Sequence, residues 1–118
     1  MELPAPSIKG FTSAISLSKL KDPVDLSIPN EADIPVMNDV YAILGKNPET
    51  PDWCGAKVQA GQWNDEIEDI ERVRNLSVTV PKKELEKHLN ESVTLRYQTS
   101  GESGLVTSSV QLDVRIEP

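Results

Sequence analysis

The stretch that decides the fold is Ser92-Val93-Thr94-Leu95-Arg96-Tyr97-Gln98-Thr99. Its side chains alternate between apolar and polar, so Val93, Leu95 and Tyr97 fall on one face of an extended chain. Alternation with a period of two, in a segment rich in β-branched and aromatic residues, indicates a half-buried β-strand. We therefore expect these side chains to point into a core.

The same pattern recurs on both sides of this stretch. Before it, residues 76–80 place Leu76, Val78 and Val80 on one face, and Pro81 then stops the strand. After it, residues 100–104 form a turn cluster with two glycines, and residues 105–116 read as one further strand. Two strands joined by a glycine-bearing loop predict a hairpin. One face of the second strand is expected to carry Val110, Leu112, Val114 and Ile116.

Residues 81–90 break the alternation and predict the only convincing helix. Good helix formers follow Pro81, which suits a first turn, and Leu85 and Leu89 lie four residues apart on one helical face. Asn90 is suited to close the last turn. We expect a helix of one to two turns whose two leucines plug one end of the fold.

The first half of the chain carries weaker signals. Residues 24–28 alternate cleanly between prolines, and residues 39–45 are the most hydrophobic run and predict a central strand. Short strands are expected at 7–11 and 56–60, residues 13–17 fit either a strand or a loop, and connections are expected at 35–38 and 47–52. Residues 64–74 are acidic and ambiguous, because Ile67, Ile70 and Val73 have helix-like spacing and a short helix is an alternative there.

These elements predict an all-β fold, an immunoglobulin-like antiparallel β-sandwich of about seven strands with one short helix between late strands. Near-regular strand spacing and the lack of strand–helix alternation favour a sandwich over βαβ units. A chain of 118 residues is enough for one domain and too short for two. We expect residues 1–6, which are rich in proline, to form a stiff linker and residues 7–118 to form the domain.

Charge and composition argue against several classes of function, among them nucleic-acid binding and membrane insertion. The formal charge of −7 repels nucleic acid and anionic membrane surfaces, and no apolar run is long enough for membrane insertion. The single Cys54 excludes an internal disulfide, and it is expected in a different element from the single His88. One cysteine and one histidine do not make a zinc site. We therefore expect no catalysis, no metal and no cofactor.

Five segments of the sequence, taken in their order along the chain, resemble a known family: residues 3–9, 39–45, 76–85, 89–97 and 107–110. In this order they resemble the tandem immunoglobulin-like repeats of large secreted or surface proteins of Gram-negative bacteria, pseudomonads in particular. The chain departs from those repeats at Leu44, where tryptophan is frequent, at Glu91, where glycine is frequent, and in the more acidic segment 46–74.

The resemblance implies a spacer, adhesion or protein-recognition module at the cell surface or outside the cell, joined to flanking domains of a larger protein. The family has no catalytic residues to carry over. The departures suggest a diverged unit whose special role lies in the acidic segment.

Candidate binding residues gather in that segment. Exposed tryptophans stack on sugar rings or anchor protein interfaces, and Trp63 has polar neighbours, whereas Trp53 is also suited to the core. The densest acidic run has no calcium-loop spacing, so a solvated face is its plainest interpretation. Two alternatives to a spacer remain: a glycan- or ligand-binding module, and a small acidic inhibitor of a basic partner. The residues proposed for such a site are Trp53, Trp63, Asp65, Glu66, Glu68 and Asp69.

Overall fold

The structure, a computed structural model, describes residues 3–8, 10–11, 13–101 and 104–118, and its regular structure is mostly β. In chain order the elements are β1 (Ala14–Ser16), the short 3-10 helix η1 (Leu17–Lys19), β2 (Val24–Ser27), β3 (Asp39–Leu44), β4 (Trp53–Cys54), β5 (Val58–Gln59), β6 (Gly61–Asn64), β7 (Asp69–Arg72), β8 (Ser77–Val80), α1 (Lys82–Glu86), β9 (Ser92–Ser100), β10 (Val106–Ser108) and β11 (Leu112–Glu117).

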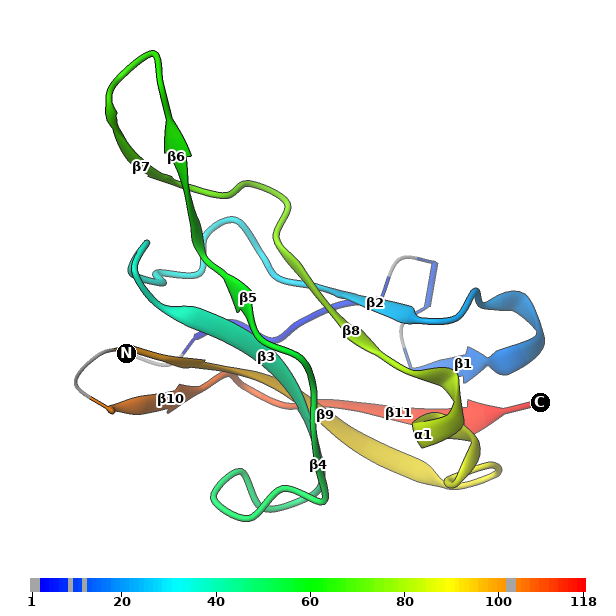
Figure 1. Ribbon diagram of the computed structural model, residues 1–118. Coiled ribbons are helices and arrows are strands. Elements are labelled where there is room, and N and C mark those ends of the chain that lie inside the picture. The colour runs from blue at the N-terminus through cyan, green and yellow to red at the C-terminus, as the bar shows by residue number, and fades with distance from the viewer. Residues whose placement is uncertain (1–2, 9, 12, 102–103) are drawn as a thin grey trace.

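Two layers of strands face each other across one core (Figure 1). The larger sheet has the order β1-β11-β9-β3-β4, with β10 beside β9 and β5 beside β3, and the smaller layer pairs β2 with β8. The predicted strands at 24–28, 39–45, 76–80 and 92–99 are confirmed, and β3 is central because it pairs with β9, β4 and β5. Their expected inward residues are buried: Val24, Leu26, Ile28, Leu76, Val78, Val80, Val93, Leu95 and Tyr97.

The larger sheet is mixed, so the prediction of a wholly antiparallel fold is wrong at one edge. Ser7 pairs with Ser27 of the smaller layer, and a few residues later β1 pairs in parallel with β11 of the larger sheet, with Ile15 opposite Ile116. The N-terminal chain therefore crosses from one layer to the other. The short strand expected at 7–11 is reduced to this bridge and a contact between Ile8 and Phe11, and Lys9 lies outside the described residues.

The strand predicted over residues 105–116 is broken by a β-bulge. Ser108 pairs with Gln98 and Leu112 pairs with Leu95. The four residue steps from Ser108 to Leu112 therefore lie opposite only three steps of β9, from Gln98 to Leu95. One extra residue reverses the faces of the residues that follow it. Val114 and Ile116 are buried as expected, but Val110 is 42% exposed, and its placement on their face is wrong.

The helix prediction holds for its first leucine only. Leu85 is buried at 1% exposure, whereas Leu89 is 41% exposed. The helix α1 ends at Glu86, and the chain turns until Asn90, which has a positive φ of 65° and donates its N–H to Ile116 O. Leu89 therefore never reaches the helical face that buries Leu85.

Residues 3–6, part of the expected linker, pack onto the domain. Leu3 and Pro6 are buried, and Leu3 forms a bridge with Ser109. The Tyr97 hydroxyl donates a hydrogen bond of 2.6 Å to Pro4 O. The first two residues of that expected linker lie outside the described residues.

In the described part of the chain, no helix has the length and apolar character needed to span a membrane.

Candidate functional site

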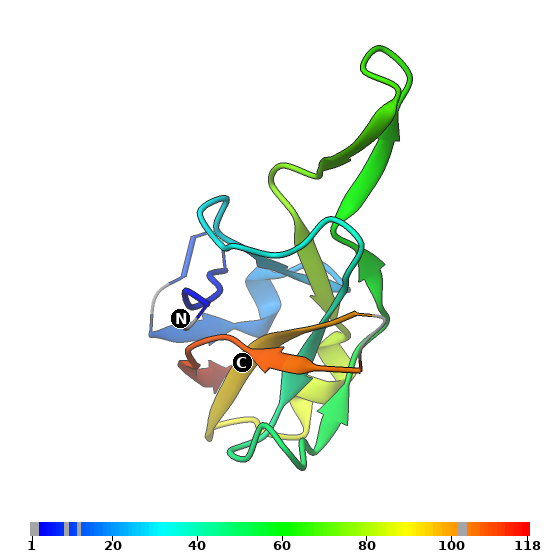
Figure 2. The same cartoon turned by 90° about the vertical axis from the view of Figure 1, so that its left-hand side faces the viewer.

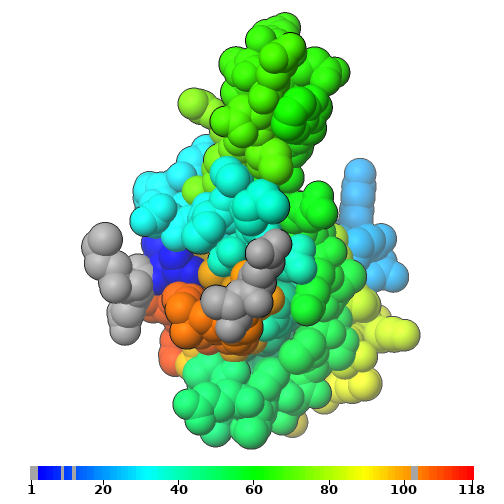
Figure 3. Space-filling view, turned by 60° about the vertical axis from the view of Figure 1, so that its left-hand side comes forward, coloured from blue at the N-terminus to red at the C-terminus, as the bar shows by residue number. Residues whose placement is uncertain are grey.

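A two-stranded hairpin projects from the body of the molecule (Figure 2). It consists of β6, the turn at residues 65–68 and β7, and we call residues 61–72 the arm. Gly61 pairs with Arg72 and Asn64 pairs with Asp69. Figure 3 shows the arm as a knob that joins the body at a narrow neck. The alternative of a short helix over residues 64–74 is therefore wrong.

The arm has one apolar and one polar face. Trp63 lies directly opposite Ile70, and because side chains alternate along a strand both point to the same side. The other side carries Gln62 and Glu71, paired opposite one another, with Asn64 and Asp69 beyond them. Trp63 is 60% exposed, an unusual degree of exposure for a large aromatic side chain.

Close packing at the neck fixes where the arm leaves the body. A Cβ at Gly61 would lie 2.5 Å from Val36 O and 2.7 Å from Ile70 Cγ2, so only glycine fits there. The backbone N–H of Val73 donates to Ala60 O, and the Arg72 guanidinium donates to Ala32 O. The arm therefore starts from a position held by both of its strands.

Local hydrogen bonds shape the tip of the arm. The indole N–H of Trp63 donates to Asp65 Oδ1 at 2.7 Å, and the Glu66 N–H donates to Asn64 Oδ1 at 2.9 Å. Glu68 has a positive φ of 51°, a turn conformation. Because Asp65 satisfies the indole N–H, the ring of Trp63 is left to make apolar or stacking contacts.

A shallow groove of about 250 Å³ runs along the apolar face where the arm meets the body. Met37, on the connection before β3, is 62% exposed beside it, and Ile67 at the arm tip is 58% exposed. The residues that line the groove are Val36, Met37, Gln59, Gly61, Gln62, Trp63 and Ile70. Sequence reasoning missed Val36, Met37 and Gln59, because nothing local connects them with Trp63.

The predicted acidic residues lie on the arm and are exposed: Asp65, Glu66, Glu68 and Asp69. In the residues that the structure covers, no three histidine, cysteine or acidic side chains are grouped so that they could hold a metal ion. These carboxylates therefore give the tip of the arm a negatively charged surface, and Asp65 contacts Trp63.

Trp53 lies apart from the arm. It belongs to β4, pairs with Leu44 and packs against the core, and Figure 1 places β4 well away from β6. Its ring lies over Gly55, whose missing side chain leaves room for it: a Cβ there would be 2.9 Å from the Trp53 ring. The structure thus brings Trp63 together with the acidic residues and leaves Trp53 outside that site.

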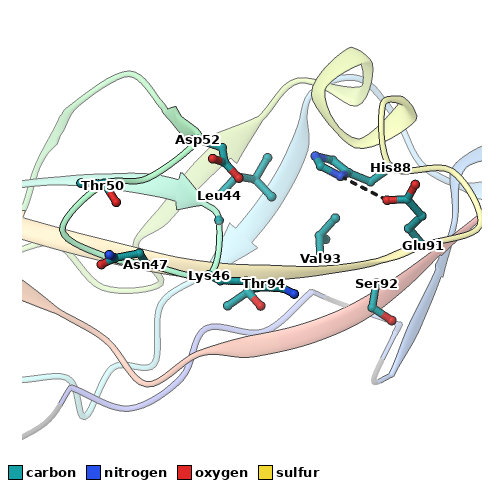
Figure 4. Close-up of a pocket in the computed structure, with 11 residues that line it drawn as sticks. Leu44, Lys46, Asn47, Thr50, Asp52, His88, Glu91, Ser92, Val93 and Thr94 are labelled. Atoms are coloured by element: carbon teal, nitrogen blue, oxygen red, sulfur yellow. Dashed lines mark ion pairs between the residues drawn. The ribbon is translucent and has the colours of Figure 1, made fainter.

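A second concavity, of about 450 Å³, lies between the loop after β3 and the start of β9 (Figure 4). Asn47, Thr50 and Asp52 line one side of it. On the other side His88 Nδ1 lies 4.0 Å from a carboxylate oxygen of Glu91. Cys54 is not among the lining residues. Sequence reasoning missed this polar hollow, because its two sides are about forty residues apart and meet only through the pairing of β3 with β9.

Comparisons with protein-family models, with curated proteins and with solved structures find no match for this chain.

Proposed function

We propose that the chain is a non-catalytic, immunoglobulin-like module of a larger bacterial secreted or surface protein, and that it recognises a protein partner through the arm. The arrangement of strands supports the first part. One layer pairs β2 with β8, and the other places β11, β9 and β3 side by side. Immunoglobulin-like sandwiches have a comparable division between two sheets, joined by crossing connections.

The observation that carries the recognition role is the projecting arm with Trp63 exposed on its apolar face. Tryptophan is enriched among the residues that dominate binding energy at protein interfaces. A pure spacer has no physical need for an exposed tryptophan on an extension of this kind.

Site-specific photo-cross-linking in the parent protein tests this proposal. A photoreactive amino acid replaces Ile67 at the arm tip, and in a matched control it replaces Leu89, which is also exposed but lies on the body. We expect a discrete protein adduct from position 67 and none from position 89. The same adducts from both positions, or none from position 67, contradict recognition through the arm.

Glycan binding is a second candidate, favoured by the Trp63 ring, whose N–H is already bonded to Asp65. Its test uses a Trp53→Phe background, so that fluorescence reports Trp63 alone. A shift in emission with one member of a glycan panel supports it, when calorimetry shows that this glycan binds the wild-type chain and does not bind Trp63→Ser. Unchanged emission across the panel rejects it.

A further inference from the structure

The groove on the apolar face of the arm is an unpartnered surface. Within the described chain, β6 and β7 pair only with each other, so no third strand covers the outer edges of the arm, although the Ile70 N–H donates to Asp69 Oδ1. An isolated two-stranded hairpin is marginally stable in water and gains from a third strand or an apolar neighbour. The exposed side chains of Met37, Trp63 and Ile67 add apolar area that a partner is able to cover.

Apart from Arg72 at its base, the charges on the arm are all negative. Residues 61–71 contain five carboxylates and no lysine or arginine: Asp65, Glu66, Glu68, Asp69 and Glu71. Arg72, at the neck, is turned to the body by its bond to Ala32 O. A four-residue strand is about 13 Å long, and screening at physiological salt acts over about 8 Å. The carboxylates at the tip therefore act mainly on the part of a bound segment that runs along the arm beyond Trp63, and less on the part at the neck.

From the open groove and this charge we infer that the partner presents a basic segment, in which apolar side chains alternate with or adjoin lysine and arginine. The inference rests on the proposed recognition function and names the chemistry of the partner. Apolar side chains of the segment contact Trp63 and Ile70, and its cations face Asp65 at the rim. The strand edges of the arm offer backbone hydrogen bonds to an extended segment.

The same charge disfavours a second copy of this chain as the occupant. Each copy carries a formal charge of −7, and two arms would bring like charges together. Complementary charge steers association and suppresses partners of the wrong sign, so a basic segment is the better match.

Selection from a random peptide library displayed on phage tests the inference, with the full chain as bait. The arm-charge variant combines Asp65→Asn, Glu66→Gln, Glu68→Gln and Asp69→Asn. A matched body-charge variant combines Asp25→Asn, Glu49→Gln, Glu86→Gln and Glu117→Gln, all exposed and outside the arm. A third variant, Trp63→Ser, keeps the charge and removes the apolar anchor. Unfolding curves check that each variant is folded.

We expect the selected peptides to carry net positive charge together with apolar residues. Their affinity should fall at least tenfold with the arm-charge variant and with Trp63→Ser, should be unchanged with the body-charge variant, and should weaken with added salt. Peptides without net positive charge, or equal binding to both charge variants, overturn the inference.

The outcomes separate the two proposals. Peptides that lack positive charge yet lose binding with Trp63→Ser overturn the basic partner and leave recognition by the arm intact. Peptides that bind all variants equally count against the arm itself. Light scattering that shows a dimer, lost in Trp63→Ser, replaces the basic segment with a second copy and also overturns the inference.

Discussion

Replacement of Tyr97 by phenylalanine removes one hydroxyl that ties the N-terminal segment to the core. Tyr97 is fully buried, and its hydroxyl donates a hydrogen bond of 2.6 Å to Pro4 O. The ring and its packing are retained in phenylalanine. The change therefore isolates the bond that holds residues 3–6 against the larger sheet.

The expected loss follows from the net worth of one hydrogen bond. Such a bond contributes about 0.5–1.5 kcal/mol. Pro4 is half-buried, so water can replace part of the lost bond, and we expect about 1 kcal/mol. For a domain of this size that corresponds to a decrease in Tm of about 4 °C.

The pH dependence gives this prediction a second signature. Burial raises the pKa of Tyr97 from 10.0 to about 12, with a smaller lowering contribution from Arg72 and a raising one from Glu31. The unfolded chain loses this proton at a lower pH than the folded protein does. The contribution of the protonated Tyr97 hydroxyl to the free energy of unfolding is therefore complete below a pH of about 10. It decreases by on the order of 1 kcal/mol per pH unit as the pH rises from there towards about 12.

Urea unfolding followed by tryptophan fluorescence measures both effects. We expect the phenylalanine variant to be less stable near neutral pH and to approach the wild type near a pH of about 11. The matched control for the loss near neutral pH is Tyr41→Phe, because the described residues offer the Tyr41 hydroxyl no hydrogen bond and the contact of its ring with Lys57 is retained. Burial also raises the pKa of Tyr41, so this control does not apply to the pH dependence. Equal stability of Tyr97→Phe and the wild type at neutral pH, or a difference that stays constant with pH, would refute the reasoning.

Three further predictions concern the core, the bulge and the neck of the arm. Leu85→Ala should cost about 2–5 kcal/mol in urea unfolding, whereas Leu89→Ala should change stability by less than about 0.5 kcal/mol, and equal losses would contradict their different burial. By the same assay, Val114→Ala should lower the free energy of unfolding by about 2 kcal/mol, whereas Val110→Ala should leave it nearly unchanged. A large loss for Val110→Ala would show that Val110 lies in the core and would contradict the bulge. Gly61→Ala should either lower the free energy of unfolding by about 1–3 kcal/mol or displace the arm, and a displaced arm would show faster amide hydrogen exchange in β6 and β7. If neither stability nor exchange changed, the close approach of Gly61 to Val36 would be contradicted.

Part of the candidate site was predictable from the sequence. The polar neighbours of Trp63 indicate exposure, and the acidic run adjoins it in the chain. The hairpin was not predictable, because Ile67, Ile70 and Val73 also fit a helix. The pairing of β6 with β7 distinguishes the two conformations, and the spacing of these three apolar residues does not indicate it.

The inward faces of the main strands were determined by the sequence alone, because alternation with a period of two is a local property. Val93, Leu95 and Tyr97 point inward for that reason, and so do Val78 and Val80. The prediction that the strand over residues 92–99 is only half-buried is wrong, because tertiary packing also buries Arg96, Gln98 and Thr99.

Tertiary structure decided what depends on register and on contacts between distant segments. The extra residue before Leu112 turned Val110 outward, and the crossing between layers made β1 parallel to β11. The meeting of Met37 with Trp63 created the groove on the arm. A local pattern records which side chains share a face, but not which strand lies beside it, because many pairings bury the same face equally well.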